Sequence, residues 1–283
     1  MNIGQHIKKS SVLLKNSGIE TATLDVLILL EDILNVNRAQ LLAHPDSELT
    51  IKQQKILGLQ IKRRKNHEPL AYIRGKTEFY GHEFMVNKHV LQPRPESETM
   101  IDMLKKLNLK TPKIADIGTG SGVLAITAKL EITKAQIIAI DIDKKALDVA
   151  RQNARKHKVT VKFLQGNLLE PIYKLGPKTG GLVLLCNLPY VPNNFHTNLS
   201  VGYEPKHAIF GGSDGLDLYR ELFNQLDPSF VSQHTVPYIL TESLPVQHKA
   251  LARIAQKKGY ALRQTTDFIQ LYCYAKAQNT SRH

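Results

Sequence analysis

The stretch ADIGTGSGVLAITAKL, Ala115–Leu130, decides the fold. It joins a short apolar run to an apolar helical pattern through three alternate glycines, Gly118, Gly120 and Gly122. Glycine tolerates a positive φ and lets a ligand rest against backbone N–H groups at a helix N-terminus. The pattern therefore predicts a strand, a ligand-binding loop and a helix. Its spacing, G-x-G-x-G, differs from the G-x-G-x-x-G of dinucleotide-binding folds.

Acidic residues stand on both sides of these glycines. Asp116 precedes them, and Asp141 ends the next apolar run, QIIAID, 19 residues after Gly122. A carboxylate at a second strand end can accept hydrogen bonds from both hydroxyls of an adenosine ribose. The arrangement is similar to the S-adenosylmethionine loop of class I methyltransferases. The alternatives are a glycine turn that binds nothing and an Asp141 that only caps a helix.

Short apolar strands alternate with helical patterns along the second half of the chain. This alternation predicts an α/β fold, a parallel sheet with helices on both faces. The resemblance of the glycine loop implies that this is a Rossmann-like class I methyltransferase sheet of seven mostly parallel strands. Ligands of such sheets bind at the carboxyl ends of the strands. The expected strands are 113–118, 136–141, 160–165, 182–187, 237–242 and a final pair within 259–275.

The beginning of the chain has a different pattern. Residues 23–34 and 51–65 carry the apolar spacing of helices, and Thr50 is a plausible N-cap for the second. The following stretch is rich in aromatic and β-branched residues between glycines, as in a hairpin. We therefore expect an N-terminal helical bundle over 1–67, a β-hairpin connector over 68–92 and a methyltransferase domain over 93–283.

Composition excludes several classes of protein. Apolar residues make up 42% and charged residues 22%, as in a soluble globular protein, and no apolar run is long enough for a membrane span. The N-terminus, MNIGQHIKKSSVLL, lacks the pattern of a secretion signal. The two cysteines, Cys186 and Cys273, form no disulfide framework or metal cluster, which suits the reducing cytoplasm. We expect a cytoplasmic protein without a bound metal, and a buried strand position for Cys186.

The formal net charge of +13 favours acidic partners such as nucleic acid or a ribonucleoprotein. The densest basic stretches are Lys62–Lys65 and Lys144–Lys162. They have two interpretations, a solvated helix face and a surface for weak contact with nucleic acid or the ribosome. Charge alone does not establish RNA binding.

A second motif ends the apolar run LVLLCNLPYVP, Leu182–Pro192. Methyl transfer from a sulfonium to a planar NH2 group requires the nitrogen to be held in line with the methyl carbon. The side-chain carbonyl of Asn187 and the backbone carbonyl of Leu188 can grip the two N–H bonds. Pro189 restricts Leu188 to extended conformations, and Tyr190 can stack on a planar group. The motif therefore predicts a clamp for an amide or an exocyclic amine.

This tetrad resembles the N-P-P-Y of amino-group methyltransferases, with Leu188 in place of the first proline. N-L-P-Y also occurs in enzymes that dimethylate ribosomal RNA adenines, so the tetrad does not choose the substrate. EPLAYIRGKTEFYGHEFMVNKHVLQPRPESE and YEPKHAIFGGSDGLDLYREL extend the resemblance over about residues 65–226. Together these stretches resemble the HemK-like peptide chain release factor glutamine methyltransferases.

The resemblance implies the cofactor S-adenosyl-L-methionine and a substrate, the glutamine in the Gly-Gly-Gln loop of peptide chain release factors, methylated at N5. It implies an N-terminal domain that helps to hold the protein substrate, and we expect a monomer. The glycine loop would hold the methionine portion, Asp141 the ribose, and Asn167 and Leu168 the adenine. The residues assigned to the cofactor are Asp116, Gly118, Thr119, Gly120, Ser121, Gly122, Asp141, Asn167, Leu168 and Asn187, and those assigned to catalysis are Asn187, Leu188, Pro189 and Tyr190.

Two departures from the family pattern bear on function. Asn167 stands where the family usually has Asp, so we expect weaker cofactor affinity. TESLP, residues 241–245, lacks the glycine that usually follows the acid. Two other hypotheses stay open, an N-methyltransferase acting on an adenine or cytosine amino group in RNA or DNA, and a noncatalytic binding module.

Overall fold

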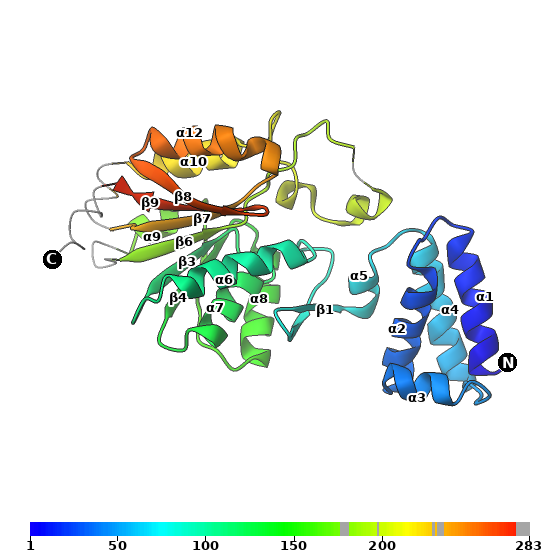
Figure 1. The fold of residues 1–283 in the computed structure, drawn as a ribbon. Helices are drawn as coiled ribbons and strands as arrows, with labels where there is room; N and C mark the ends of the chain where they lie inside the picture. Colours follow the sequence, from blue (N-terminus) through cyan, green and yellow to red (C-terminus); the bar gives the residue numbers. More distant parts are fainter. Residues whose placement is uncertain (176–180, 197, 228–229, 231–234, 276–283) are drawn as a thin grey trace. The chain divides into compact units, whose positions relative to one another are not determined.

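The computed structural model describes residues 1–175, 181–196, 198–227, 230 and 235–275, which form two compact units. The helical unit comprises Met1–Lys76 together with Asn198–Tyr203, and the sheet unit takes the rest of the described chain (Figure 1). The later segment belongs to the helical unit although it lies far away in sequence. Within that unit, the Tyr203 hydroxyl donates a hydrogen bond to the Asn66 carbonyl over 2.6 Å.

The helical unit is built from short helices around one apolar cluster that includes Leu14, Leu29 and Leu57. Three of its five described helices begin at a capping box, in which Asn or Thr at the N-cap exchanges hydrogen bonds with a glutamine three residues later. Thr50 is one of these caps, as the sequence predicted. The helices are α1 (Ile3–Lys15), α2 (Ala22–Leu34), α3 (Arg38–Ala43), α4 (Ile51–Lys65) and α5 (Leu70–Arg74).

The connecting hairpin is shorter than the expected span of 68–92. It consists of β1 (Lys76–Phe79) and β2 (His82–Met85), and the residues before it form α5. Pro69 stands at the N-cap of α5, and Gly75 ends it with a left-handed φ of +74°. The aromatic and β-branched residues of this stretch thus divide between a five-residue helix and the hairpin.

The sheet unit contains one seven-stranded sheet in the order β5-β4-β3-β6-β7-β9-β8. The first five strands in this order are parallel and β9 is antiparallel to both of its neighbours. The expected class I methyltransferase sheet is confirmed. The strands are β3 (Lys113–Ile117), β4 (Gln136–Asp141), β5 (Lys162–Gln165), β6 (Leu182–Cys186), β7 (Tyr238–Glu242), β8 (Tyr260–Thr266) and β9 (Ile269–Tyr274).

The strand order reverses between β3 and β6. From β3 the chain proceeds outward through β4 and β5, and it then returns to the other side of β3 with β6 and β7. Such a switch point leaves a crevice beyond the carboxyl ends of the two central strands, where ligands of these sheets bind. The glycine loop follows β3 and the Asn187 tetrad follows β6, so both predicted motifs leave the sheet at this point.

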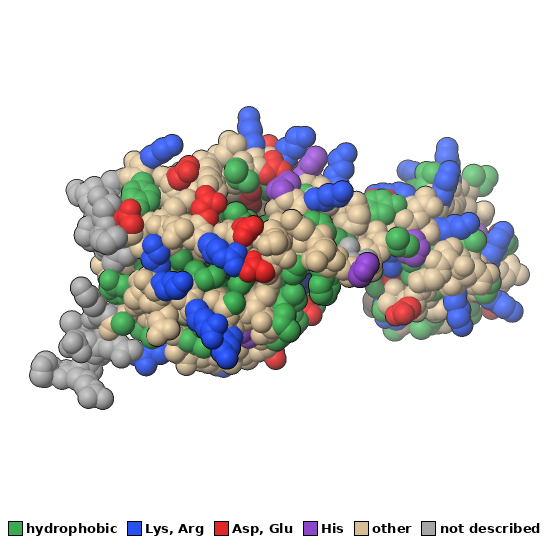
Figure 2. All heavy atoms as spheres, turned by 90° about the horizontal axis from the view of Figure 1, so that it is seen from above, with side chains coloured by type: hydrophobic (Ala, Val, Ile, Leu, Met, Phe, Trp, Pro, Cys, Tyr) green, Lys and Arg blue, Asp and Glu red, His purple; other side chains and the backbone are tan. Residues whose placement is uncertain are grey.

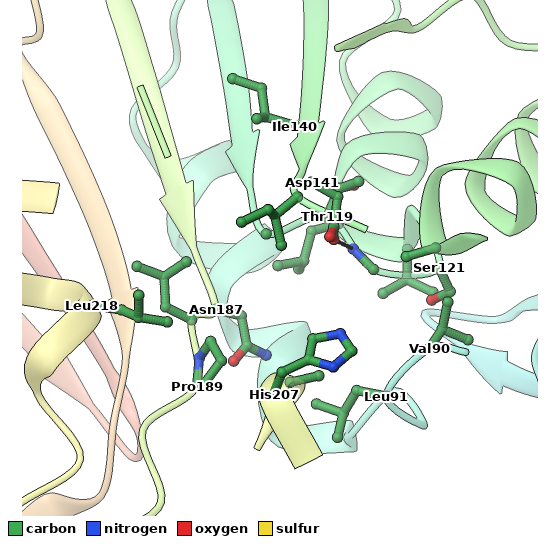
Figure 3. Close-up of a pocket in the computed structure, with 18 of the residues that line it drawn as sticks. Val90, Leu91, Thr119, Ser121, Ile140, Asp141, Asn187, Pro189, His207 and Leu218 are labelled. Carbon is green, nitrogen blue, oxygen red and sulfur yellow. Dashed lines mark hydrogen bonds between the residues drawn. The ribbon is translucent and has the colours of Figure 1, made fainter. Parts of the chain in front are cut away.

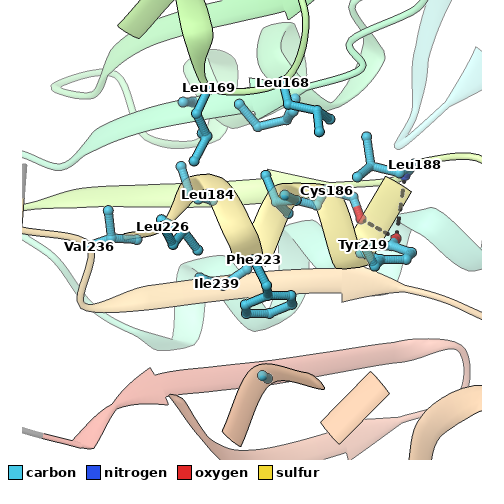
Figure 4. Packing of buried hydrophobic residues seen from close by; sticks show 14 of the residues in the cluster. Leu168, Leu169, Leu184, Cys186, Leu188, Tyr219, Phe223, Leu226, Val236 and Ile239 are labelled. Atoms are coloured by element: carbon cyan, nitrogen blue, oxygen red, sulfur yellow. Dashed lines mark hydrogen bonds between the residues drawn. The ribbon is translucent and has the colours of Figure 1, made fainter. Parts of the chain in front are cut away.

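Helices cover both faces of the sheet (Figure 1). Leu184 of β6 packs into one buried cluster with Tyr219 and Phe223 (Figure 4), and Val183 and Leu185 pack into the other. This two-residue alternation is why β6 reads as a continuous apolar run. The helices are α6 (Glu98–Lys106), α7 (Val123–Glu131), α8 (Lys144–Lys156), α9 (Glu170–Tyr173), α10 (Asp217–Gln225) and α12 (His248–Gln256), with 3-10 turns at Pro95–Ser97, Leu199–Tyr203, Lys206–Ala208 and Pro245–Gln247.

Basic side chains are dispersed over the face shown in Figure 2, interspersed with acidic ones. In the cluster Lys62–Lys65, Arg63 pairs with Glu68 and Arg64 pairs with Asp25. This pairing favours an ordinary helix surface for that cluster, and nucleic-acid contact stays a prediction. None of the helices in the described residues is both long and apolar enough to cross a membrane.

The buried ion pair between α2 and α4 generates a stability prediction. Arg64 donates to Asp25 over 2.6 Å, and the two side chains are 12% and 5% exposed. Arg64→Leu leaves the Asp25 carboxylate buried without its partner, so the free energy of unfolding should fall by about 3 kcal/mol. Arg38→Leu breaks the more exposed pair with Glu31 and should cost less than about 1 kcal/mol. Urea denaturation followed by circular dichroism measures both free energies, and equal losses in the two variants would contradict a special cost of breaking the buried pair.

Candidate active site at the switch point of the sheet

A cavity of about 330 Å³ lies at the carboxyl ends of β3, β4 and β6, the size range of small-molecule sites. Figure 3 shows Asn187 and Pro189 on one side of it and Thr119, Asp141 and Ser121 on another. The structure places these predicted residues on its wall: Gly118, Thr119, Gly120, Ser121, Asp141, Asn167, Leu168, Asn187, Leu188 and Pro189. Asp116, Gly122 and Tyr190 are absent from the wall.

The glycine loop is held in a fixed curve by the neighbouring strand. Gly118 and Thr119 both donate their backbone N–H groups to the Ile140 carbonyl, at 2.9 and 2.8 Å. Gly118 has a φ of +73°, and a Cβ there would meet the Leu188 side chain at 3.1 Å. Gly122 has a different role, since a Cβ there would meet Ala150 of α8 at 3.0 Å. Gly118 keeps the loop close to the tetrad, whereas Gly122 keeps α7 close to α8.

Asp116 lies behind the loop. Its Oδ2 accepts hydrogen bonds from the Thr119 hydroxyl at 2.6 Å and from the Ala125 N–H at 3.1 Å. Oδ1 is buried and has no hydrogen-bond partner among the described residues. Burial raises the pKa of Asp116 to about 7, against the effect of these two donors. Asp116 therefore stabilises the loop through these two hydrogen bonds and does not line the cavity.

Asp141 connects the loop to the end of β4. Its Oδ2 accepts from the Gly120 N–H at 2.8 Å, and its Oδ1 accepts from the Asp143 N–H at 2.9 Å. Burial raises the pKa of Asp141, and these backbone donors oppose the rise. Each carboxylate oxygen has two lone pairs, so both oxygens can accept a further hydrogen bond from a ligand.

A chain of hydrogen bonds orients the Asn187 amide. Asn187 Nδ2 donates to Ser97 Oγ at 2.9 Å, and the Ser97 hydroxyl donates to Glu242 Oε2 at 2.6 Å. A carboxylate only accepts, so the serine proton faces Glu242 and the serine lone pair faces the amide NH2. Asn187 Oδ1 receives no hydrogen bond from a described residue. Asn187 lines the cavity, so an amide carbonyl without a partner among the described residues belongs to its wall residues.

Glu242 also fixes the last residue of the tetrad. The Tyr190 hydroxyl donates to Glu242 Oε1 at 3.0 Å. Burial is the largest cause that raises the pKa of Tyr190, and the Glu242 charge adds to it. Tyr190 thus supports the site from beside the cavity. Its expected stacking on a substrate stays a prediction.

The buried Tyr219 connects the carboxyl ends of β6 and β7. The Tyr219 hydroxyl lies 2.9 Å from the Cys186 carbonyl and 2.5 Å from the Glu242 carbonyl, which share its proton. The same oxygen accepts from the Leu188 N–H at 3.4 Å (Figure 4). Cys186 is fully buried on β6, as expected.

The opposite wall comes from the segment before α6 and from the turn after the tetrad. Arg94 donates to the buried Glu204 at 2.6 Å, and the Gln92 N–H donates to the same carboxylate at 3.1 Å. This pairing holds the turn that carries His207, whose ring faces the cavity in Figure 3. The turn lies beside β4, because His207 is 3.8 Å from Asp143.

Sequence reasoning missed several of these residues. Glu242 had a usable signal, since it is an acid that ends a strand at the same sheet edge as Asp141. Ser97 and Tyr219 are a common polar residue and an aromatic residue far away in sequence, and their contacts depend on the folded chain. No group of three His, Cys, Asp or Glu side chains in the described residues is arranged to hold a metal ion.

Comparison with known proteins shows the family of this chain. Residues 5–75 match the model of the PrmC N-terminal domain, and residues 95–187 match that of ribosomal protein L11 methyltransferase (PrmA). The structure of the hMettl16 catalytic domain in complex with MAT2A 3'UTR hairpin 1 is similar, with a TM-score of 0.53 and 12% identity over 88% of this chain and 89% of that one. That likeness shows the fold alone.

The sheet order and this likeness define the class I methyltransferase fold. A release factor glutamine methyltransferase of Bacillus cereus is 35% identical over 234 residues, which cover 80% of this chain and 81% of the relative. One of Coxiella burnetii is 33% identical over 251 residues, 88% of this chain and 87% of the relative. The chain belongs to the release factor glutamine methyltransferase family.

The buried acid behind the loop generates a pH prediction. The pKa of Asp116 is about 7 in the folded protein against an ordinary 3.8, so the folded state binds more protons between these values. The free energy of unfolding should therefore fall as pH rises from about 4 to about 7, relative to an Asp116→Asn variant that cannot titrate. Calorimetric Tm values from about pH 4 to about pH 9 measure this difference, which should be constant above about pH 8. Asp148→Asn, at an exposed position, is the control, and a parallel course for wild type and Asp116→Asn would contradict the assignment.

Proposed function

We propose that this protein is an S-adenosylmethionine-dependent methyltransferase that methylates the side-chain amide nitrogen of the glutamine in the Gly-Gly-Gln loop of peptide chain release factors. The names of the relatives support this substrate. The observation that carries the proposal is the Asn187 side chain, which lines the ligand cavity and whose carbonyl has no hydrogen-bond partner among the described residues. Since release factors act on ribosomes, we place the reaction in the cytoplasm.

The cavity fits the cofactor. Gly118–Gly122 provide the close backbone approach for the methionine portion, and Asp141 has acceptor capacity for two ribose hydroxyls. When bound, S-adenosylmethionine supplies a methyl group on a positively charged sulfur. The apolar side chains of Val90, Leu91 and Leu218 line the same cavity and exclude water from it.

The tetrad fits a planar amide substrate. Asn187 Oδ1 can accept one N–H of the glutamine NH2, and the Leu188 carbonyl can accept the other. Two acceptors fix the direction of the nitrogen lone pair, which is the main requirement for in-line displacement. Glu242 interacts with the Asn187 side chain both directly and through Ser97, so we assign Glu242 and Ser97 as positioning residues. The amide proton can leave after methyl transfer, and the reaction needs no dedicated general base.

Substrate labelling tests the proposal. Enzyme is incubated with methyl-labelled S-adenosylmethionine and either a release factor or a mixture of RNA and DNA. We expect label on the release factor, located by mass spectrometry at the glutamine of its Gly-Gly-Gln loop. A release factor with alanine in place of that glutamine should stay unlabelled. Label in nucleic acid alone would overturn the substrate, and the absence of cofactor binding in calorimetry would indicate a noncatalytic module.

The Asn187→Ala variant tests the clamp. Without the carboxamide the substrate nitrogen loses an acceptor during transfer, so turnover should fall by about 100-fold or more. The cofactor product S-adenosylhomocysteine should bind with nearly unchanged affinity in calorimetry. Asn193→Ala makes the same change at an exposed position and should retain wild-type turnover. Wild-type turnover in Asn187→Ala would remove this residue from the mechanism.

The Ser97→Ala variant separates positioning from binding. It removes the hydroxyl that accepts from the Asn187 NH2 group and leaves Glu242 as the remaining group that orients the amide, so the orientation is held less firmly. We expect kcat to fall by about 10-fold, the effect of one hydrogen bond, with the dissociation constant for S-adenosylhomocysteine retained. A loss of cofactor affinity with unchanged kcat would show that Ser97 serves the cofactor site and not the clamp.

A further inference from the structure

The adenine end of the cavity contains a second amide whose orientation is fixed. Asn167 follows β5 and lines the cavity together with Leu168. Its Nδ2 donates a short hydrogen bond to Glu221 of α10. No described residue donates to its Oδ1. Glu221 is half-buried, and it is not among the residues that line the cavity.

The polarity of this contact follows from the groups around it. The Leu169 N–H donates to Gln225 Oε1 at 2.8 Å, so the Gln225 NH2 group is directed elsewhere. That NH2 lies 3.5 Å from Glu221 Oε1, on the side of the carboxylate that Asn167 also contacts. A carboxylate only accepts hydrogen bonds, so the Asn167 amide must turn its NH2 toward Glu221. Its carbonyl is then the polar atom left for a ligand.

We propose that Glu221 is a positioning residue that makes Asn167 an obligate acceptor, so that the cofactor site selects a purine with a 6-amino group. The inference rests on the proposed function, because it takes the cavity to hold an adenosine. It also accounts for the asparagine at a position where an aspartate was expected. With Glu221 beside it, a neutral amide offers the same acceptor that a carboxylate would offer, without two adjacent negative charges.

The selectivity has a simple physical origin. An exocyclic amine can donate to the Asn167 carbonyl, whereas a 6-oxo purine would place its own acceptor opposite that carbonyl. If the Asn167 amide could rotate by about 180°, it could bind either purine, with its carbonyl accepting from a 6-amino group or its NH2 donating to a 6-oxo group. Glu221 prevents this exchange. The preference for the 6-amino group therefore depends on a residue that does not touch the purine.

Calorimetry with two ligands tests this role. S-adenosylhomocysteine and S-inosylhomocysteine differ at the 6-position, and wild type should bind the first at least about 10-fold more tightly. Glu221→Met keeps the length of the side chain and removes the acceptor. In this variant the ratio of the two dissociation constants should fall by about 5-fold or more. Glu170→Met makes the same change at an exposed position three residues from Asn167 and should leave the ratio unchanged.

A reciprocal exchange provides the second measurement. Asn167→Asp places a carboxylate against Glu221, so S-adenosylhomocysteine should bind about 3- to 10-fold more weakly at about pH 8. Adding Glu221→Gln to that variant supplies an NH2 donor for the new carboxylate, and the affinity should return to within about 3-fold of wild type. If Glu221 had only a structural role, the double variant would bind S-adenosylhomocysteine more weakly than Asn167→Asp alone.

The outcomes separate this inference from the proposed function. If wild type does not bind S-adenosylhomocysteine, the cofactor assignment fails, and the inference fails with it. If wild type binds but Glu221→Met weakens both ligands equally, the cofactor assignment stands and the positioning role is overturned. Tight binding by Asn167→Asp with Glu221 intact would also overturn it. A reduced ratio in Glu221→Met with rescue in the double variant supports the role.

Discussion

The site depends on one property of a buried carboxylate, which is that it accepts hydrogen bonds and donates none. Glu242 receives the hydroxyls of Ser97 and Tyr190, and the direction of each proton is thereby fixed. Burial raises the pKa of Glu242, and the hydrogen bonds from Ser97, Tyr190 and Asn187 oppose that rise. Because Ser97 is directed toward Glu242, the Asn187 amide has one orientation. In the proposed clamp, the direction of the Asn187 carbonyl is therefore set by a residue that does not line the cavity.

The parts of this arrangement that could be predicted from the sequence are those encoded locally. The glycine loop, Asp141 and the Asn187 tetrad each follow an apolar strand, and the carboxyl ends of parallel strands meet at one edge of the sheet. Ser97 contacts Asn187 across 90 residues of sequence, and no local pattern marks such a pair. The helix Leu70–Arg74 is too short for its apolar spacing to be distinguished from that of a strand.

The leucine in the tetrad shows how a departure from a motif is accommodated. A proline at this position would have no N–H group, whereas the Leu188 N–H donates to Tyr219 at 3.4 Å. The Leu188 side chain is buried and contacts the loop at Gly118, where a Cβ would meet it at 3.1 Å. The substitution therefore exchanges the rigidity of a proline ring for a hydrogen bond and an apolar contact. The carbonyl that the clamp requires is present with either residue.

Asn187 and Asn167 line one cavity, and the same physical solution orients both. Each is a neutral amide whose NH2 group is occupied by a chain of partners that ends in a glutamate, Glu242 for the first and Glu221 for the second. A charged acceptor on the cavity wall would have to be desolvated whenever a ligand enclosed it, and an amide carbonyl costs less to bury. The charged groups, Glu242 and Glu221, are not among the residues that line the cavity, and they set the orientation of the two amides from there. On the proposed roles of these two amides, the groups that set specificity lie outside the residues that line the pocket.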